Sequence, residues 1–425
     1  MLRSFSVFAT PLRDLLATAS VRLRSGLAAP TVAVGVVGGV VGAAYVGALH
    51  VLSLVLGPEH HRGGTQIAIL VAVGAAVAVI TRLGGETGNV ELLVDNIHVL
   101  GGAESARGLR SLVPSSLLCV AAGAAMGPEA PLVQTTGTIG TTIATRSQRP
   151  AADVRVLTIT GMAAGFTVLF GAPLGAAFFA LEILHRRGLQ YYEALMPALV
   201  GSSCGYVVYL GLSGLGIEPI WQLRDFGPLG LDDLAVAAVV GVVGVAIAAL
   251  FTATVGALRR LLAPVPTALR YVLGGAALGV LGLWSPYALT FGESQLESAL
   301  DPKLAVGAVA VAALAKFLGT TVTLAAGWKG GFIIPLFFIG ATLGQVAHAA
   351  LPWADGTVLT ACAMVAICVA VTKTPVGTTL VVTEIAGLSL LPVTIVTAVV
   401  AVVLSARVSL IDTQRARTVA VDGAG

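Results

Sequence analysis

The residue whose chemistry stands out is Glu129, a single carboxylate inside the glycine- and proline-rich cluster Gly127-Pro-Glu-Ala-Pro131. Glycine and proline directly before an apolar run are typical of a helix N-terminus. Such an end exposes backbone N–H groups and about half an elementary positive charge. A deprotonated Glu129 can occupy an anion site there, and a protonated one can leave it. The pattern predicts a gate. The alternative is a carboxylate that caps a helix without gating.

Two further clusters open apolar runs in the same way. They are Gly84-Gly-Glu-Thr-Gly-Asn-Val-Glu91 and Gly330-Gly-Phe-Ile-Ile-Pro335. Several converging helix N-termini form an anion site without a full positive charge. A permeating anion must also leave its site, and a buried lysine or arginine would hold it more tightly. The three clusters therefore predict a pathway for small anions.

The elements that position these clusters belong in a membrane. The chain of 425 residues is 56% hydrophobic and 11% charged, against about 25% charged residues in soluble domains. Long apolar runs approach the roughly 20 residues that a spanning helix needs. They cover residues 31–57, 66–80, 234–258, 304–324 and 393–406.

Shorter apolar segments, interrupted by glycine and proline, recur in the two halves of the chain. They cover residues 127–140, 171–184, 330–344 and 374–387. The second and fourth align without a gap, so that Pro173, Gly175 and Glu182 pair with Pro375, Gly377 and Glu384. Gly140 and Gly344 follow matching prolines upstream. Broken helices at corresponding positions of two halves indicate a substrate site near the middle of the membrane.

Taken together, the clusters resemble the CLC family of chloride channels and proton-coupled anion antiporters over nearly the whole chain. The cluster around Glu129 is similar to the family's G-[KR]-E-G-P, whose glutamate is the gate. The cluster Gly330-Gly-Phe-Ile-Ile-Pro335 resembles G-x-F-x-P, with its phenylalanine one place early. The segment Thr87-Gly-Asn-Val-Glu91 is similar to S-G-I-P-E. The resemblance implies that these residues bind the anion: Thr87, Gly88, Asn89, Pro128, Ala130, Phe332, Ile333 and Ile334.

The same resemblance implies an all-α integral membrane fold of two inverted repeats, whose broken helices meet at a central anion site. It also implies a homodimer with one pore per subunit. We expect a cytoplasmic N-terminal segment over 1–30, one transmembrane domain over 31–412 with halves of about 31–215 and 230–412, and a short cytoplasmic tail over 413–425 without a regulatory domain. Arginines near both ends favour cytoplasmic termini of a multi-pass cell-membrane protein.

Departures from the family pattern bear on proton coupling. Pro128 replaces a basic residue. Coupled chloride antiporters carry two adjacent glutamates, but here Glu182 is followed by Ile183, which is thus the lost proton-relay position. The inner tyrosine is replaced by Ser389 or Gly387, depending on the alignment. We expect Glu182 and its repeat partner to be structural, beside a headgroup or an arginine.

The flanks of the clusters are similar to the fluoride/proton antiporter branch, notably Asp95-Asn-Ile-His98. Yet the glutamate and threonine of that branch are here Phe332 and Ile334. Asp95 and His98 are predicted to form one polar face of an amphipathic helix, either solvated or in contact with headgroups, rather than to carry protons.

These features predict passive conduction of small anions, chloride foremost, gated by Glu129. A proton-coupled chloride or fluoride antiporter is the alternative. The six histidines are scattered, and the four cysteines show no CxxC spacing. We therefore expect no enzyme, no metal site and no cofactor. Because no basic stripe with interleaved aromatics is present, we expect no nucleic-acid partner.

Overall fold

The computed structural model describes residues 26–85, 90–103, 106–186, 190–215, 221, 223, 226–301, 303–411 and 413–414. Within these ranges the regular structure is helical. The helices are α2 (Ala28–Leu56), α3 (Gly64–Gly84), α4 (Val90–Leu100), α5 (Leu109–Ala121), α6 (Glu129–Arg146), α7 (Ala151–Phe170), α8 (Pro173–Glu182), α9 (Leu195–Ser213), α10 (Leu231–Leu262), α11 (Thr267–Trp284), α12 (Glu293–Ala299), α13 (Val306–Ala325), α14 (Ile333–Ala350), α15 (Gly356–Thr372), α16 (Pro375–Ala386) and α17 (Leu391–Leu404). Short 3-10 turns cover Tyr192–Ala194, Pro286–Ala288 and Leu388–Leu390.

Eight helices of the described chain are long and apolar enough to cross a membrane: α2, α3, α7, α9, α10, α11, α13 and α14. They differ in how much of their surface other helices cover. The apolar window of α7 is 94% buried, whereas that of α2 is 33% buried. The exposed apolar faces of the outer helices suit lipid, and α7 belongs to the protein interior.

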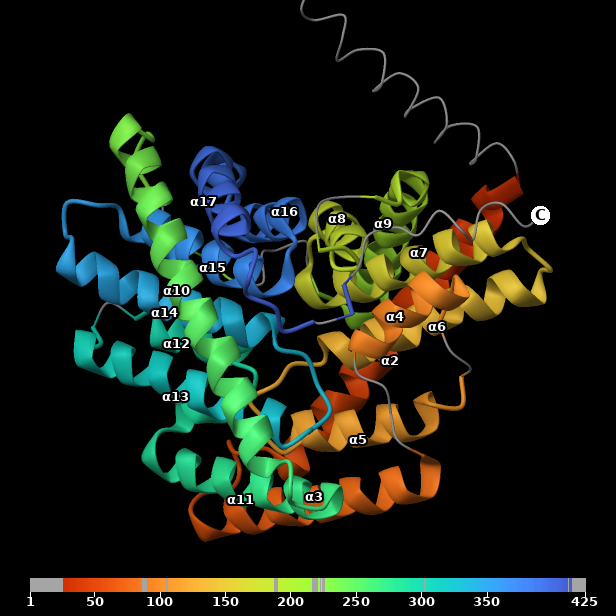
Figure 1. The fold of residues 1–425 in the computed structure, drawn as a ribbon, viewed down its shortest axis with the longest axis horizontal. Coiled ribbons are helices and arrows are strands. Elements are labelled where there is room, and N and C mark those ends of the chain that lie inside the picture. The colour runs from red at the N-terminus through yellow and green to blue at the C-terminus, as the bar shows by residue number, and fades with distance from the viewer. Residues whose placement is uncertain are drawn as a thin grey trace, which may run out of the picture.

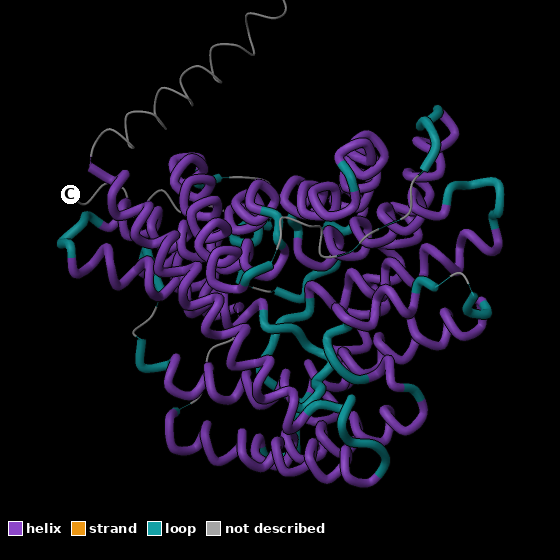
Figure 2. The backbone as a smooth tube through the Cα atoms, turned by 180° about the vertical axis from the view of Figure 1, so that it is seen from behind, coloured by secondary structure: helices purple, strands orange, loops and turns teal. Residues whose placement is uncertain are grey.

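The two halves of the chain form matching helix sets. In Figure 1 the red-to-yellow first half occupies one side and the green-to-blue second half the other. The pair α6–α7 corresponds to α14–α15, and α3 packs against α11 along the lower edge. Figure 2 shows loop segments that run into the middle of the helical mass. The expected fold of two repeats with broken helices is confirmed.

Glycines at equivalent positions of the two repeats allow close contacts between helices. A side chain at Gly140 on α6 would collide with the carbonyl of Leu157 on α7. A side chain at the equivalent Gly344 on α14 would collide with the backbone of Thr360 on α15. Small residues allow such close packing of membrane helices. The repeated glycines therefore hold the two broken helices against α7 and α15 in the same way.

The helices α8 and α16 cap each other. The Glu182 carboxylate, at the C-terminal end of α8, accepts hydrogen bonds from the N–H groups of Val376 (3.2 Å) and Gly377 (2.8 Å) on α16. The Glu384 carboxylate on α16 accepts from Leu174 (3.2 Å) and Gly175 (2.6 Å) on α8. Each glutamate thus satisfies free N–H donors of the opposite helix.

These contacts correct the expected surroundings of the two repeated glutamates. Their partners are backbone amides, and neither a headgroup nor an arginine is needed to explain them. The structural role itself follows directly from the geometry, because lipid cannot satisfy the N–H groups that the carboxylates bind.

We predict that Glu182→Ala lowers the free energy of unfolding by about 2 kcal/mol, because it leaves one buried and one partly buried N–H group without an acceptor. Unfolding of the purified protein in detergent, followed by denaturant titration, measures this loss. Glu297→Ala is the matched control, because Glu297 is an exposed glutamate on α12. Equal stability of the two variants would contradict the capping role.

Candidate functional site

Two glycine-rich loops, one from each half, meet at the centre of the site. The N–H of Gly127 donates to the carbonyl of Gly331 (2.8 Å), and the N–H of Gly331 donates to the carbonyl of Gly127 (2.6 Å). This isolated antiparallel bridge joins the loop before α6 to the loop before α14. Two broken helices are therefore fixed with their N-termini near each other.

The Glu129 side chain reaches from the start of α6 to the start of α14. Its Oε1 accepts a hydrogen bond from the N–H of Ile334 at 2.6 Å. The residue is fully buried, and its Oε2 has no hydrogen-bond partner among the described residues. The carboxylate thus lies at the N-terminus of α14, where the helix dipole and the free N–H groups favour negative charge.

Both bridging glycines leave space for this carboxylate. A side chain at Gly127 or at Gly331 would collide with Oε2 of Glu129. The backbone of both halves therefore closes around one carboxyl group. The glycines at these positions are required by close approach rather than by a turn, because neither has a positive φ.

The predicted anion-contacting residues divide into two groups. Pro128 precedes α6 as its N-cap, and Ala130 lies in its first turn. Phe332 is the N-cap of α14, with Ile333 and Ile334 in the first turn. The structure brings these five residues together around Glu129. Three further predicted residues, Thr87, Gly88 and Asn89, lie outside the described residues, directly before the start of α4.

The predicted lost relay position lies at the C-terminal end of α8. Ile183 is the C-cap of α8 and is buried. Its carbonyl accepts a hydrogen bond from Gln414 Nε2 (2.9 Å), which also donates to the carbonyl of Thr372 (2.7 Å). Sequence reasoning missed Gln414, because a glutamine in the C-terminal tail carries no signal of a buried contact. Of the two candidates for the inner tyrosine position, Ser389 is exposed and Gly387 ends α16.

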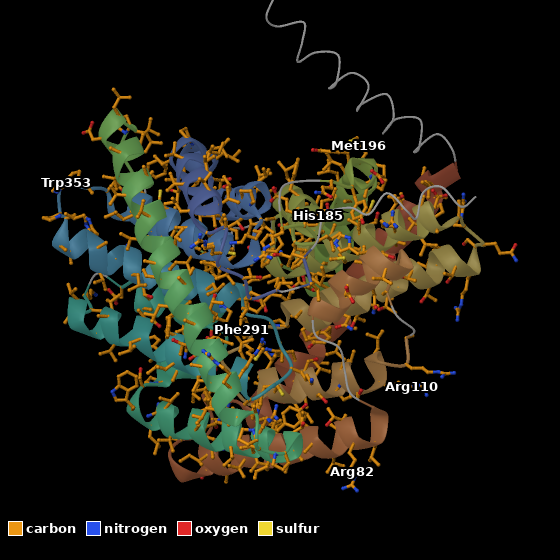
Figure 3. All side chains as sticks on the ribbon, in the orientation of Figure 1. Arg82, Arg110, His185, Met196, Phe291 and Trp353 are labelled. Carbon is orange, nitrogen blue, oxygen red and sulfur yellow. The ribbon has the colours of Figure 1, made fainter. Side chains whose placement is uncertain are left out.

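The predicted solvated position of His98 is wrong. His98 is 4% exposed, and its Nε2 lies 2.7 Å from the carbonyl of Leu184. Because a carbonyl only accepts, Nε2 donates, and in the neutral ring Nδ1 accepts from the hydroxyl of Tyr191 at 3.0 Å. The ring of His185 lies 5.1 Å away. Figure 3 places His185 among the helices, whereas Arg82 and Arg110 lie at the edge.

This histidine therefore joins α4 to the segment after α8. An amphipathic pattern identified the polar residues of α4 correctly, but it cannot tell a solvated face from one that packs on another polar group. Within the described chain, no group of three histidine, cysteine, aspartate or glutamate side chains is arranged to hold a metal ion.

Comparison with known proteins gives the family. A family model described as voltage gated chloride channel matches residues 98–406. A chloride/fluoride channel protein of Pseudomonas syringae pv. tomato is 27% identical over 365 residues, which are 82% of this chain and 78% of that protein. A putative chloride channel protein, ClcB-like, of Ralstonia nicotianae is 32% identical over 274 residues, or 61% of this chain and 62% of that protein.

Solved structures share the fold. A CLC-type fluoride/proton antiporter aligns with a TM-score of 0.78 at 22% identity, over 92% of this chain and 98% of that chain. A slow cyanobacterial Cl-/H+ antiporter aligns with a TM-score of 0.74 at 21% identity, over 88% of this chain and 94% of that chain. The family consists of membrane transporters and channels rather than enzymes. Since the family model covers more than half of the sequence, this multi-pass membrane protein belongs to the voltage-gated chloride channel (CLC) family of anion transport proteins.

Proposed function

We propose that the protein conducts small anions, chloride foremost, passively through a pore that Glu129 closes. The observation that carries the proposal is the position of the Glu129 carboxylate at the N-terminus of α14, 2.6 Å from the N–H of Ile334. A diffusible anion would bind the same donor. The carboxylate and the anion therefore compete for one place, and flow requires the side chain to leave.

The contacts of Glu129 are those of a group that can move. The carboxylate has one hydrogen bond to α14, and its second oxygen is bare among the described residues. Glu182 and Glu384, by contrast, each accept two backbone hydrogen bonds. Protonation would remove the charge that holds Glu129 at the helix end. The pore should accordingly open when the gate takes up a proton.

The absence of coupling is supported by the surroundings of Ile183. A proton relay to Glu129 needs titratable groups, because a bare proton does not cross hydrocarbon. Ile183 supplies none, and the neighbouring Glu182 is bound to the N-terminus of α16. Phe332 stands where the fluoride branch has its carboxylate. These residues favour anion flow without proton exchange.

Exchange of chloride or fluoride for protons is the second candidate. It is favoured by the likeness in fold to a fluoride/proton antiporter and to a chloride/proton antiporter. The chloride/fluoride channel protein of Pseudomonas syringae supports fluoride as a second possible anion. In this alternative, Glu129 would still be the group that exchanges places with the anion.

We further propose a homodimer in the cell membrane, with one pore per subunit and both termini cytoplasmic. Neighbouring helices α8, α16 and α17 expose apolar side chains, among them Leu174, Val376, Val399 and Val403. Dimerisation is typical of the family, and this face could bury such side chains against a second copy.

We predict that Glu129→Gln abolishes acid activation. In the native protein, flux should rise on acidification by up to about tenfold per pH unit, in proportion to the protonated fraction of one gate. The variant should show high flux that does not change with pH. Chloride efflux from liposomes between pH 7.5 and 5.0 measures both. Glu297→Gln, on the exposed side of α12, should behave like the native protein.

A steric variant tests the same gate without changing its charge. Gly331→Ala places a methyl group where Oε2 of Glu129 lies, so it should expel the carboxylate and raise flux at pH 7.5. If Glu129→Gln retained the native pH dependence, the gate would have to be assigned to another residue.

Passive flow predicts a reversal potential set by the anion gradient alone. In liposomes with a chloride gradient, an imposed pH gradient of two units should leave the reversal potential unchanged. Uphill proton movement driven by chloride would support the antiporter instead. Glu182→Gln then becomes the discriminating variant, because loss of proton movement with chloride flux retained would identify Glu182 as the relay.

The proposed assembly predicts twice the subunit mass in mild detergent and in bilayers. Light scattering corrected for bound detergent, or single-molecule photobleaching in bilayers, measures it. The chain has a mass of 42.7 kDa. A particle that contains one chain at all concentrations would exclude the dimer and leave the transport proposal untouched.

A further inference from the structure

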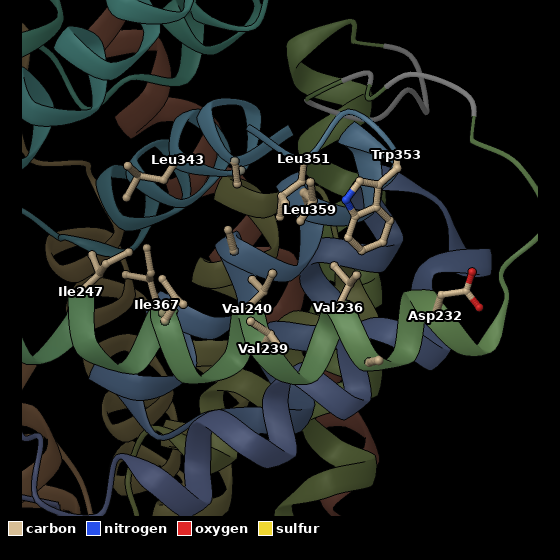
Figure 4. A pocket seen from close by; sticks show the side chains of 16 residues that line it. Asp232, Val236, Val239, Val240, Ile247, Leu343, Leu351, Trp353, Leu359 and Ile367 are labelled. Atoms are coloured by element: carbon tan, nitrogen blue, oxygen red, sulfur yellow. The ribbon is translucent and has the colours of Figure 1, made fainter. Parts of the chain in front are cut away.

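A groove on the outside of the helical mass runs along α10. Its walls are α10, α14 and α15, and its volume is about 370 Å³. Figure 4 shows Asp232 and Trp353 at one end of the groove, and Ile247 and Leu343 toward the other. Apart from Asp232 and the indole of Trp353, the lining side chains are apolar.

The direction of the groove matches that of a lipid chain. From Asp232 to Ile247, α10 rises about 22 Å, at 1.5 Å per residue. Both α10 and α14 are apolar enough to span a membrane. The groove therefore starts at the beginning of a spanning helix and continues for more than the roughly 15 Å of one leaflet's hydrocarbon.

A polar cavity of about 380 Å³ adjoins the groove at Trp353, which lines both. The indole is 68% exposed, and tryptophan is typical of the membrane–water boundary. The apolar groove and the polar cavity thus have the two-part character of a phospholipid, with a place for one acyl chain and a place for its headgroup.

Acceptors predominate at this mouth. Asp355 uses Oδ1 to cap α15, accepting from the N–H groups of Thr357 and Val358. His348 Nδ1 lies 2.8 Å from the carbonyl of Ala354 and so donates to it, which makes Nε2 of the neutral ring an acceptor. Asp232 stands exposed in the first turn of α10. No lysine or arginine is among the residues that line either cavity.

We propose that this groove is a binding site for a phospholipid with a primary-amine headgroup, such as phosphatidylethanolamine. The acyl chain lies along α10 between Val240 and Leu359, and the ammonium group donates to the carboxylates of Asp232 and Asp355. A primary ammonium has N–H donors for these acceptors. A trimethylated ammonium has none, and an anionic headgroup meets two like charges.

Quenching of Trp353 by lipids with brominated acyl chains measures binding to the full chain in nanodiscs. The signal of Trp353 is the difference between the native protein and Trp353→Phe, because three other tryptophans contribute equally to both. We expect brominated phosphatidylethanolamine to bind about three to five times more tightly than brominated phosphatidylcholine, as for an exposed ion pair. Brominated phosphatidylglycerol should bind more weakly than either.

Two kinds of variant separate the headgroup from the chain. In the double variant Asp232→Asn/Asp355→Asn, phosphatidylethanolamine and phosphatidylcholine should bind about equally tightly. The asparagine at position 355 can still cap α15. Glu297→Gln is the matched control and should keep the preference for the primary amine. Val240→Phe fills the groove and should reduce quenching by all three lipids. If Val240→Phe does not fold, Ala347→Leu is a second variant that fills the groove.

Equal binding of the three lipids, or a preference for the anionic one, would overturn the headgroup assignment. Quenching that is unchanged in both groove-filling variants would overturn the acyl-chain site. Both results concern lipid binding and do not depend on anion transport. The lipid site and the proposed pore are therefore tested independently.

Discussion

The constraint on which the structure depends is that broken helices leave N–H groups that a membrane interior cannot satisfy. This chain satisfies several of them with carboxylates from the opposite half. Glu182 caps α16, Glu384 caps α8, and Glu129 reaches α14. Each contact crosses between the halves, so the caps also bind the two repeats to each other.

The three carboxylates differ in how firmly they are held. Glu182 and Glu384 each accept two backbone hydrogen bonds, and charge-assisted bonds of this kind are among the strong ones. Glu129 has one such bond to α14. Its other carboxylate oxygen lies against Gly127 and Gly331 and accepts no hydrogen bond among the described residues. One type of interaction therefore forms a firm contact at two places and a weaker one at Glu129, the residue that we propose as the gate.

Helix contacts built on glycine support this arrangement. The backbone of α6 approaches α7 at Gly140, and that of α14 approaches α15 at Gly344. Because α7 and α15 are almost wholly buried, α6 and α14 pack against a rigid interior. The outer helices α2, α10 and α11 are buried over about a third or less of their apolar windows, and their exposed apolar side chains suit lipid. The groove beside α10 lies on this outer surface, where α10, α14 and α15 leave space between them.

The sequence by itself determined the membrane class, the repeat and the broken helices, and it placed Glu129 at the start of one of them, because hydropathy and the order of glycine and proline are local properties. It also paired Glu182 with Glu384. Only the tertiary structure decided what each glutamate contacts, because a helix N-terminus can be capped by any acceptor that folding brings near it. The burial of His98 and the contact of Gln414 with the end of α8 were hidden for the same reason. Local patterns fix which groups need partners, and the packing of distant segments selects the partners.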